Sequence, residues 1–194
     1  MKILLLGPPN QKLAIFLRED GHQILEKESP FDVQFLKNNH IDFTISYGYR
    51  HIIKSDILNY MKDRIINLHI SYLPWNRGAD PNLWSFLEDT PKGVTIHCMD
   101  EGIDTGDIIS QKMVEFDTRT ETLRTTYNKL SKEILMLFQE IWPLIVKGQI
   151  IIKRQIEEGT FHKLSDKDRF KHLFSNGWDT PVEYLRGKAI LKSI

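Results

Sequence analysis

The sequence of 194 residues has one cysteine, Cys98, and no excess of either charge. A lone cysteine excludes an intrachain disulfide and favours a reducing compartment, so we expect a cytoplasmic protein. Lys and Arg number 26, as do Asp and Glu, which gives a formal net charge of zero. A balanced chain lacks the electrostatic footprint of proteins that bind nucleic acids or membrane surfaces nonspecifically. We therefore expect neither partner.

Long apolar runs are also missing. No stretch approaches the ~20 apolar residues that a bilayer-spanning helix needs. The apolar run at residues 3–6 leads directly into Gly7-Pro8-Pro9 and is too short for a signal peptide, so we expect no leader. The chain is 41% hydrophobic and 27% charged, as in ordinary globular proteins. At this length folding should bury roughly 70% of the extended surface without a structural metal or disulfide.

A glycine-rich phosphate turn is absent as well. Gly7 follows the first apolar run, where dinucleotide-binding folds carry G-x-G-x-x-G. Residues 7–10 instead read Gly-Pro-Pro-Asn, and the two prolines remove two amide donors. This argues against a nicotinamide-dependent oxidoreductase and favours a plain strand-to-helix turn.

Short apolar runs alternate along the chain with segments of helical periodicity. Strands are predicted at residues 2–6, 22–25, 41–46, 65–70, 94–99, 108–115 and 150–156. Helices are predicted at residues 11–20, 31–39, 81–87 and 120–147. The alternation predicts an α/β fold with a Rossmann-like, mostly parallel, twisted sheet and flanking helices. We predict a catalytic domain over residues 1–150 and a small C-terminal strand and helix extension over residues 151–194.

Two polar side chains occupy the end of the predicted strand at residues 65–70. Because a strand has a period of two, Asn67 and His69 should share one face while Leu68 points away. The carboxyl ends of strands in open α/β sheets are where ligands bind. An acidic loop with two glycines follows at residues 100–107. Acyl transfer to an amine needs a group that polarises the acyl oxygen, one that handles the amine proton and one that tunes the proton carrier.

Each of these features alone has an ordinary structural explanation. A histidine at a strand end is more often structural than catalytic, and an asparagine there often caps a turn. Acidic loops with glycine usually form turns. The spacing of the common calcium-binding loop is not matched at residues 100–107, so no metal site is expected.

The joint pattern is more specific. The runs INLHISYLPWNRG (residues 66–78) and VTIHCMDEGIDTGDII (residues 94–109) resemble the catalytic core of the folate-dependent formyltransferases. That family includes glycinamide ribonucleotide and methionyl-tRNA formyltransferases. The resemblance places the family's catalytic residues on Asn67, His69 and Asp104. It implies 10-formyltetrahydrofolate as formyl donor, with no metal and no covalent enzyme intermediate.

The sugar-nucleotide branch of the family is the most similar. Residues 72–84 (YLPWNRGADPNLW), 159–162 (GTFH) and 177–182 (GWDTPV) resemble enzymes that N-formylate dTDP-linked amino-dideoxy sugars, such as dTDP-4-amino-4,6-dideoxyglucose. The products of those enzymes enter lipopolysaccharide O-antigens. The resemblance also implies a homodimer built largely from the C-terminal segment. The position of the acceptor amine on the sugar and the identity of the nucleotide stay open.

Binding residues follow from the same comparison. The loops at residues 47–53 and 100–104 are expected to line a pteridine slot, with contacts from Tyr49, Arg50, Ile52, Ile53, Asp100, Glu101 and Gly102. Core packing explains Ile52 and Ile53 equally well. On the acceptor side the candidates are Trp75, Asn76, Arg77, Gly78 and Trp84. Arg77 suits a pyrophosphate and a tryptophan suits a base, although Trp84 is also explained by burial in a short helix.

In the expected mechanism, Asn67 and protonated His69 donate hydrogen bonds to the acyl oxygen, and Asp104 favours the charged imidazole.

Two alternative functions remain. One is a formyltransferase for another small amine, such as an amino acid, a siderophore precursor or glycinamide ribonucleotide. The missing phosphate turn argues against glycinamide ribonucleotide, and the short chain with zero net charge argues against tRNA. The other is an inactive interaction module with the same fold.

Overall fold

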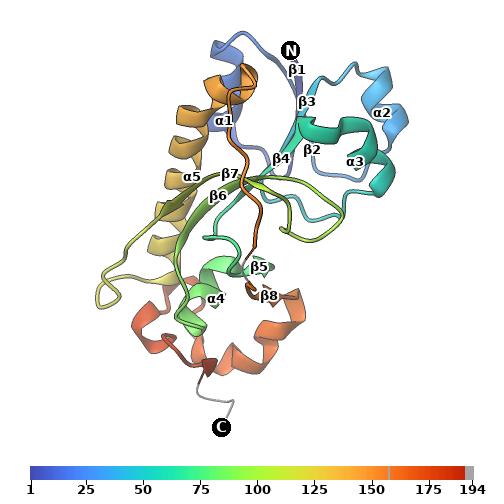
Figure 1. Cartoon of the computed structure of the whole chain (residues 1–194). Coiled ribbons are helices and arrows are strands. Elements are labelled where there is room, and N and C mark those ends of the chain that lie inside the picture. Colours follow the sequence, from blue (N-terminus) through green and yellow to red (C-terminus); the bar gives the residue numbers. More distant parts are fainter. Residues whose placement is uncertain (157, 191–194) are drawn as a thin grey trace. The chain divides into compact units, whose positions relative to one another are not determined.

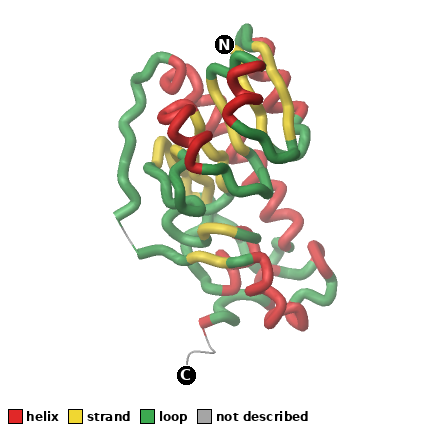
Figure 2. The backbone as a smooth tube through the Cα atoms, turned by 90° about the vertical axis from the view of Figure 1, so that its right-hand side faces the viewer, coloured by secondary structure: helices red, strands yellow, loops and turns green. Residues whose placement is uncertain are grey.

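A six-stranded sheet organises the computed structural model, which describes residues 1–156 and 158–190. Its strand order is β2-β1-β3-β4-β6-β7. The strands are β1 (Lys2–Leu6), β2 (Gln23–Lys27), β3 (Phe43–Ser46), β4 (Ile65–His69), β6 (Gly93–Cys98) and β7 (Ile108–Met113). β1 pairs in parallel with β2 and β3, and β3 with β4. The predicted α/β fold with a mostly parallel, Rossmann-like sheet is confirmed (Figures 1 and 2).

Five α-helices accompany the sheet: α1 (Gln11–Glu19), α2 (Val33–Asn38), α3 (Ser55–Met61), α4 (Pro81–Leu87) and α5 (Leu123–Val146). A 3-10 helix, η1 (Lys62–Arg64), leads into β4. Four of the α-helices were predicted. Side-chain caps fix two starts, because Asn10 accepts a hydrogen bond from the Leu13 amide and Asp32 accepts one from the Phe35 amide. α3 was missed because seven residues carry little periodicity, although Ile57, Leu58 and Met61 are buried.

The central strand β1 is apolar on both faces, as buried parallel strands are. Leu4 and Leu6 pack in one cluster with Leu36 of α2 and with Ile57 and Met61 of α3. Ile3 and Leu5 point to the opposite face because side chains alternate along a strand, and they too are buried. Burying each such side chain stabilises the fold by about 1.5–3 kcal/mol. α2 and α3 lie beside each other in Figure 1, as their contacts require.

An aromatic cluster joins α1 to the last turns of α5. Trp142 is fully buried, with ring centroids 5.2 Å from Phe138 and 5.6 Å from Phe43. Its indole nitrogen donates a hydrogen bond of 2.9 Å to the Asp20 carboxylate just after α1. Phe16 of α1 meets Phe138 edge-on at 6.1 Å. The amphipathic periodicity predicted for residues 120–147 therefore reflects real burial.

The chain forms two compact units that are interleaved in sequence. The first contains residues 1–69, 96–109 and 138–154, and the second contains residues 70–95, 110–137 and 155 onward. The tail thus belongs to the same unit as the loop after β4. The division predicted at residue 150 stays a prediction about domain organisation.

The second unit has its own core around α4. Trp84, Phe86 and Leu87 are fully buried together with the tail residues Phe170 and Val182. The tail contributes 3-10 helices η2 (Leu164–Leu173), η3 (Gly177–Asp179) and η4 (Val182–Tyr184). Two short strands, β5 (Arg77–Gly78) and β8 (Phe161–His162), pair in parallel and lie side by side in Figure 2. Two-residue strands show no periodicity, so the sequence did not predict them.

The strand predicted at residues 150–156 is wrong. Only Lys153 pairs, in one antiparallel bridge with Ile108 that has hydrogen bonds of 2.7 and 2.8 Å. The flanking side chains lack a surface to pack on, since Ile151 is 82% exposed and Ile156 is 89% exposed. An apolar run predicts a strand only where a neighbouring layer covers it.

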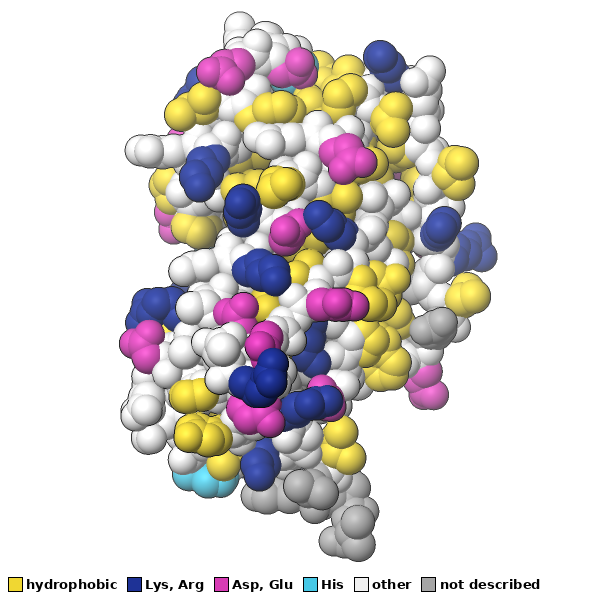
Figure 3. All heavy atoms as spheres, turned by 90° about the vertical axis from the view of Figure 1, so that its left-hand side faces the viewer, with side chains coloured by type: hydrophobic (Ala, Val, Ile, Leu, Met, Phe, Trp, Pro, Cys, Tyr) yellow, Lys and Arg dark blue, Asp and Glu magenta, His cyan; other side chains and the backbone are white. Residues whose placement is uncertain are grey.

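The face that Figure 3 displays carries side chains of both charges. Basic and acidic side chains are interspersed there, and neither sign forms a continuous field. Within residues 1–156 and 158–190, no helix is both long and apolar enough to cross a membrane.

We predict that Trp142→Ala lowers the free energy of unfolding by about 3–5 kcal/mol, because it empties a fully buried indole site and removes the hydrogen bond to Asp20. Urea denaturation measures this. Gln139→Ala, on the exposed side of the same helix, is the control and should change stability by less than about 0.5 kcal/mol. Equal urea midpoints for the two variants would contradict the packing described above.

Candidate active site

Asn67 and His69 lie at the carboxyl end of β4, on the face that also carries Ile65. Asn67 pairs in register with Ser46 of β3, and Leu68 points to the other face. His69 is 7% exposed and Asn67 is half-buried. The predicted strand therefore presents both polar side chains together, as expected.

Asp104 reaches this strand end from the loop between β6 and β7. Its Oδ1 accepts a hydrogen bond of 3.1 Å from Asn67 Nδ2, and its Oδ2 lies 3.6 Å from His69 Nδ1. Asp104 has a left-handed backbone, with φ of 55°. This conformation is rare outside glycine, although aspartate tolerates it. The structure thus brings the three predicted catalytic residues together within one compact unit.

Close backbone approaches fix the loop that carries Asp104. A Cβ atom at Gly106 would lie 1.8 Å from the Cys98 carbonyl oxygen, so only glycine fits there. Asp100 accepts hydrogen bonds from the Gly102 amide at 3.1 Å and from the Thr105 hydroxyl at 2.7 Å. Asp100 and Gly102, which were predicted as folate contacts, therefore shape the loop that carries Asp104.

His97 is a fourth member of the cluster, and sequence reasoning missed it. Its Nε2 lies 3.2 Å from Asn67 Nδ2 and 3.4 Å from Asp104 Oδ1, and the ring is only 2% exposed. Its Nδ1 lies 2.7 Å from the Cys98 carbonyl oxygen. A carbonyl only accepts, so we assign the proton to Nδ1, which leaves Nε2 as acceptor for the Asn67 amide. A histidine within the mostly apolar predicted strand at 94–99 was the available signal.

The cluster is a partly buried polar network around one carboxylate. The Asp104 side chain is 13% exposed and the His69 side chain is 9% exposed. A carboxylate at this distance stabilises positive charge on an imidazole, and the low exposure strengthens the attraction. Both N–H groups of the Asn67 amide point at protein acceptors, namely His97 and Asp104. The network can therefore hold a proton on a ring and orient an amide donor.

The residues predicted to contact folate divide into packed and exposed ones. Tyr49, Ile53 and Met99 pack against the cluster that contains Ile65. Ile53 is 7% exposed, which favours its explanation as core. Burial raises the pKa of Tyr49, whose hydroxyl donates to the Ser29 carbonyl at 3.2 Å.

The exposed set has one large apolar side chain on each loop. Ile52 is 81% exposed and Ile103 is 47% exposed, and both belong to the same compact unit as Asn67. Arg50 and Glu101 are also exposed. An apolar side chain left in solvent on each loop fits the expectation that a flat ring is covered there, although Ile103 was not among the predicted residues.

The predicted acceptor residues all lie in the second unit. Trp84 is fully buried and stacks on His162, with centroids 3.7 Å apart and planes 4° apart. Burial, not contact with a base, therefore accounts for Trp84. Asn76 is also fully buried and donates to the Thr90 hydroxyl at 2.9 Å, which makes it a brace for its loop. Trp75 is half-buried.

Arg77 and Gly78 form β5. The Arg77 guanidinium donates hydrogen bonds to the side-chain amide oxygen Oε1 of Gln155, from Nε at 3.1 Å and from Nη2 at 2.7 Å. Gly78 has φ of 88°, and a Cβ there would lie 2.3 Å from the His162 carbonyl oxygen. Glycine is thus needed for β8 to approach β5. Arg77 is the charged member of the predicted acceptor set, and its side chain is half-buried.

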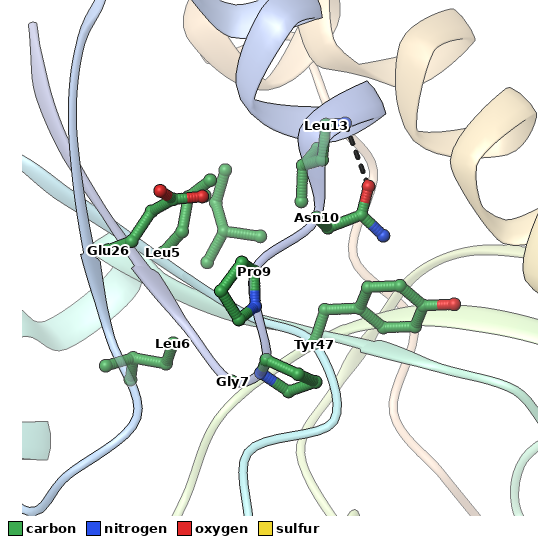
Figure 4. Close-up of a pocket in the computed structure, with 10 residues that line it drawn as sticks. Leu5, Leu6, Gly7, Pro9, Asn10, Leu13, Glu26 and Tyr47 are labelled. Atoms are coloured by element: carbon green, nitrogen blue, oxygen red, sulfur yellow. Dashed lines mark hydrogen bonds between the residues drawn. The ribbon is translucent and has the colours of Figure 1, made fainter.

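A small hollow lies at the end of β1, where dinucleotide-binding folds carry the phosphate-binding turn. It is lined by the turn at residues 7–10 and by Tyr47, and its volume is about 10 Å³, roughly one water molecule (Figure 4). Gly7, with φ of 116°, is required because a Cβ would lie 2.0 Å from the Tyr47 carbonyl oxygen. This glycine permits a close approach of two loops, and the hollow as it stands does not fit a phosphate group.

An asparagine, two histidines and an aspartate at the carboxyl end of a parallel sheet define an acyl-transfer type of site. The chain belongs to the formyl transferase family, whose sequence model matches residues 21–140. The family predicted from the sequence is confirmed.

Solved structures and curated sequences resemble the chain to different degrees. The formyltransferase PseJ from Anoxybacillus kamchatkensis, solved with UDP-4,6-dideoxy-4-formamido-L-AltNAc and tetrahydrofolate, is 53% identical. That match has a TM-score of 0.94 and covers 97% of this chain and all of the other. A 4-N formyltransferase from Francisella tularensis, 24% identical with a TM-score of 0.75 over 96% of this chain and 87% of the other, shares the fold.

Methionyl-tRNA formyltransferases are more distant. That of Listeria innocua is 29% identical over 188 residues, which cover 96% of this chain and 60% of the relative. That of Bacillus thuringiensis is 32% identical over 148 residues, which cover 75% of this chain and 47% of the relative. The matched part of this chain spans about half of these curated relatives.

Cys98, next to His97, is predicted to react slowly with thiol reagents. Burial, with help from the nearby carboxylates of Asp63, Asp107 and Asp100, raises the pKa of its thiol to about 11. Because the thiolate is the reactive form, labelling at pH 8 should be about 100-fold slower in the folded protein than in the urea-unfolded chain. Stopped-flow labelling measures both rates, with N-acetylcysteine as reference in each buffer. Equal corrected rates would contradict the assigned burial.

Proposed function

We propose that this protein transfers the formyl group of 10-formyltetrahydrofolate to the primary amine of a UDP-linked 4-amino-4,6-dideoxy sugar. The observation that carries the reaction type is the contact of Asp104 with both Asn67 and His69. The full-length similarity to PseJ, at 53% identity, supports the acceptor class. The homodimer, the cytoplasmic location and a role in O-antigen synthesis stay predictions from the family resemblance.

The formyl donor fits the first unit. Ile52 and Ile103 expose apolar surface on two loops of the unit that holds Asn67, and Tyr49 adds a half-buried ring. Covering such surface with a flat heterocycle is favourable by about 25 cal/mol per Å². Backbone groups of the 100–104 loop would bind the polar ring edge. The donor supplies a formyl carbon activated by its bond to a nitrogen that departs during transfer.

Asn67 is proposed to stabilise negative charge on the formyl oxygen. Its amide protons point at His97 and Asp104 in this structure, so one of them must exchange partner when the oxygen arrives. Asp104 can release it because the carboxylate also lies 3.6 Å from His69. Donors held ready in a partly dry site are worth about 10²–10³ in rate each.

His69 is proposed to donate to the same oxygen and to relay a proton. The acceptor amine forms a bond to the formyl carbon and loses one proton, while the departing nitrogen gains one. A ring beside the Asp104 carboxylate can carry positive charge during that exchange. No net proton is consumed. His97 holds the Asn67 amide in place and does not touch the reacting atoms in this scheme.

The acceptor is predicted to be recognised by its nucleotide and by the position of its amine. We expect the highest kcat/KM with a UDP-linked 4-amino-4,6-dideoxy sugar, compared with dTDP-4-amino-4,6-dideoxyglucose, a dTDP-3-amino sugar, glycinamide ribonucleotide and methionyl-tRNA. Release of tetrahydrofolate and mass spectrometry of the formamide measure transfer. Turnover confined to methionyl-tRNA or glycinamide ribonucleotide would refute the proposed acceptor. No transfer to any of them would favour the interaction module.

Alanine substitutions should separate chemistry from folding. Asn67→Ala is expected to lower kcat by about 10²–10³, because one donor to the formyl oxygen is lost. His69→Ala and Asp104→Ala should each remove most turnover, because the proton carrier or its stabilising charge is lost. Steady-state kinetics and circular dichroism measure rate and fold. Glu115→Ala, which changes an exposed acid outside the unit that holds these three residues, should keep normal kinetics. Near-normal kcat in a correctly folded Asp104 variant would overturn its role.

A further inference from the structure

Arg77 has an unusual partner for a half-buried arginine. Its guanidinium directs Nε and Nη2 at one neutral oxygen, Oε1 of Gln155. Among the described residues, no carboxylate lies within ion-pair distance of it. Two other arginines of the same unit differ, since Arg124 pairs with Asp179 and Arg186 with Asp89. Within the described part of the chain, the Arg77 guanidinium is therefore held by a neutral partner.

The geometry leaves part of the guanidinium available. A guanidinium carries five N–H donors in a planar fork. Gln155 takes one from Nε and one from Nη2, so both Nη1 donors and the second Nη2 donor remain. That remaining edge matches the two oxygens of a phosphate. A carboxylate at position 155 would hold the fork more tightly but would cancel the charge that attracts an anion.

The β5–β8 ribbon carries an exposed aromatic ring as well as this cation. Phe161 is the register partner of Arg77 in the parallel pair. The Phe161 ring is 45% exposed and lies over Gly78, where a Cβ would come within 2.9 Å of it. The Arg77 amide is fixed by a hydrogen bond of 2.9 Å to the Thr160 carbonyl. A cation and an exposed ring on one fixed ribbon suit a phosphate linked to a sugar or base.

We propose that Gln155 is a positioning residue that holds Arg77, fully charged, for the diphosphate of the nucleotide-linked acceptor. The proposal rests on the proposed function, since it assumes an acceptor that carries a diphosphate. In this role Gln155 acts through Arg77 and touches neither the amine nor the formyl group. The neutrality of the Gln155 side chain is the property that matters. It distinguishes this role from that of a residue that only stabilises the fold.

The decisive variant is Gln155→Glu. It keeps the shape and strengthens the contact, because a hydrogen bond to a carboxylate is stronger than one to an amide. The melting temperature should therefore stay the same or rise. The KM for the UDP-linked amino sugar should rise at least 10-fold while kcat changes less than twofold and the KM for 10-formyltetrahydrofolate stays constant. Gln149→Glu adds the same charge at an exposed site and should leave every constant unchanged.

Two further variants separate the loss of the acceptor oxygen from the loss of the guanidinium. Gln155→Met removes the acceptor oxygen without adding charge, so the acceptor KM should rise only a few-fold. Arg77→Ala should raise it at least 10-fold, and adding Gln155→Glu to Arg77→Ala should have little further effect because both act on one interaction. A stable Gln155→Glu protein with a normal KM for the acceptor would overturn the proposal and leave Gln155 with a purely structural role.

A binding measurement keeps this test separate from that of the proposed function. Calorimetry with UDP alone requires no formyl transfer. If the wild-type protein formylates none of the amines but binds UDP, and Gln155→Glu weakens that binding, the proposed reaction fails and the role of Gln155 stands. If the wild-type protein does not bind UDP, or binds it as tightly as Gln155→Glu does, the role of Gln155 is refuted.

Discussion

The hydrogen bond between Asn67 and Asp104 is the contact on which the site depends. The two residues are separated by 37 positions, and one belongs to a strand while the other belongs to a loop. The loop must turn back sharply to deliver the carboxylate, and it does so through the left-handed backbone of Asp104. Gly106, which lies against the Cys98 carbonyl, makes that return sterically feasible. The cost of this uncommon backbone conformation is offset where the carboxylate meets its polar partners.

His97 shows why the cluster is more than three residues. A half-buried amide with an unsatisfied N–H group would lose about 1–3 kcal/mol, so each Asn67 donor needs an acceptor in the absence of ligand. His97 supplies one and Asp104 the other. The Cys98 carbonyl in turn fixes which nitrogen of His97 accepts. The contacts that run from the Cys98 carbonyl through His97 to Asn67 therefore orient the Asn67 side-chain amide before substrate binds.

The sequence predicted the parts of the structure that obey local periodicity. Alternation along residues 65–70 placed Asn67 and His69 on one face, and α4 begins and ends where predicted. His97 was overlooked because one polar residue in an apolar strand has no local signature of its partners. Residues 150–156 show the converse failure, because their apolar character is real but no layer covers Ile151 or Ile156. Trp84 likewise needed its stacking partner, His162, from a distant segment.

The division of residues between the two units bears on how one family can serve several acceptors. Asn67, His69, His97 and Asp104 all belong to the first unit, whereas the candidate acceptor residues all belong to the second. The family model matches residues 21–140, so Gln155 and Phe161 lie beyond the stretch it describes. The methionyl-tRNA formyltransferase of Listeria innocua aligns with 96% of this chain. PseJ, which was solved with a UDP-linked sugar, aligns with 97% of it. Under the proposed function, a change at Gln155 would alter the charge beside Arg77, because the Gln155 side chain binds the guanidinium directly. The contacts that join Asn67 to His97 and Asp104 lie in the other unit and do not include Gln155.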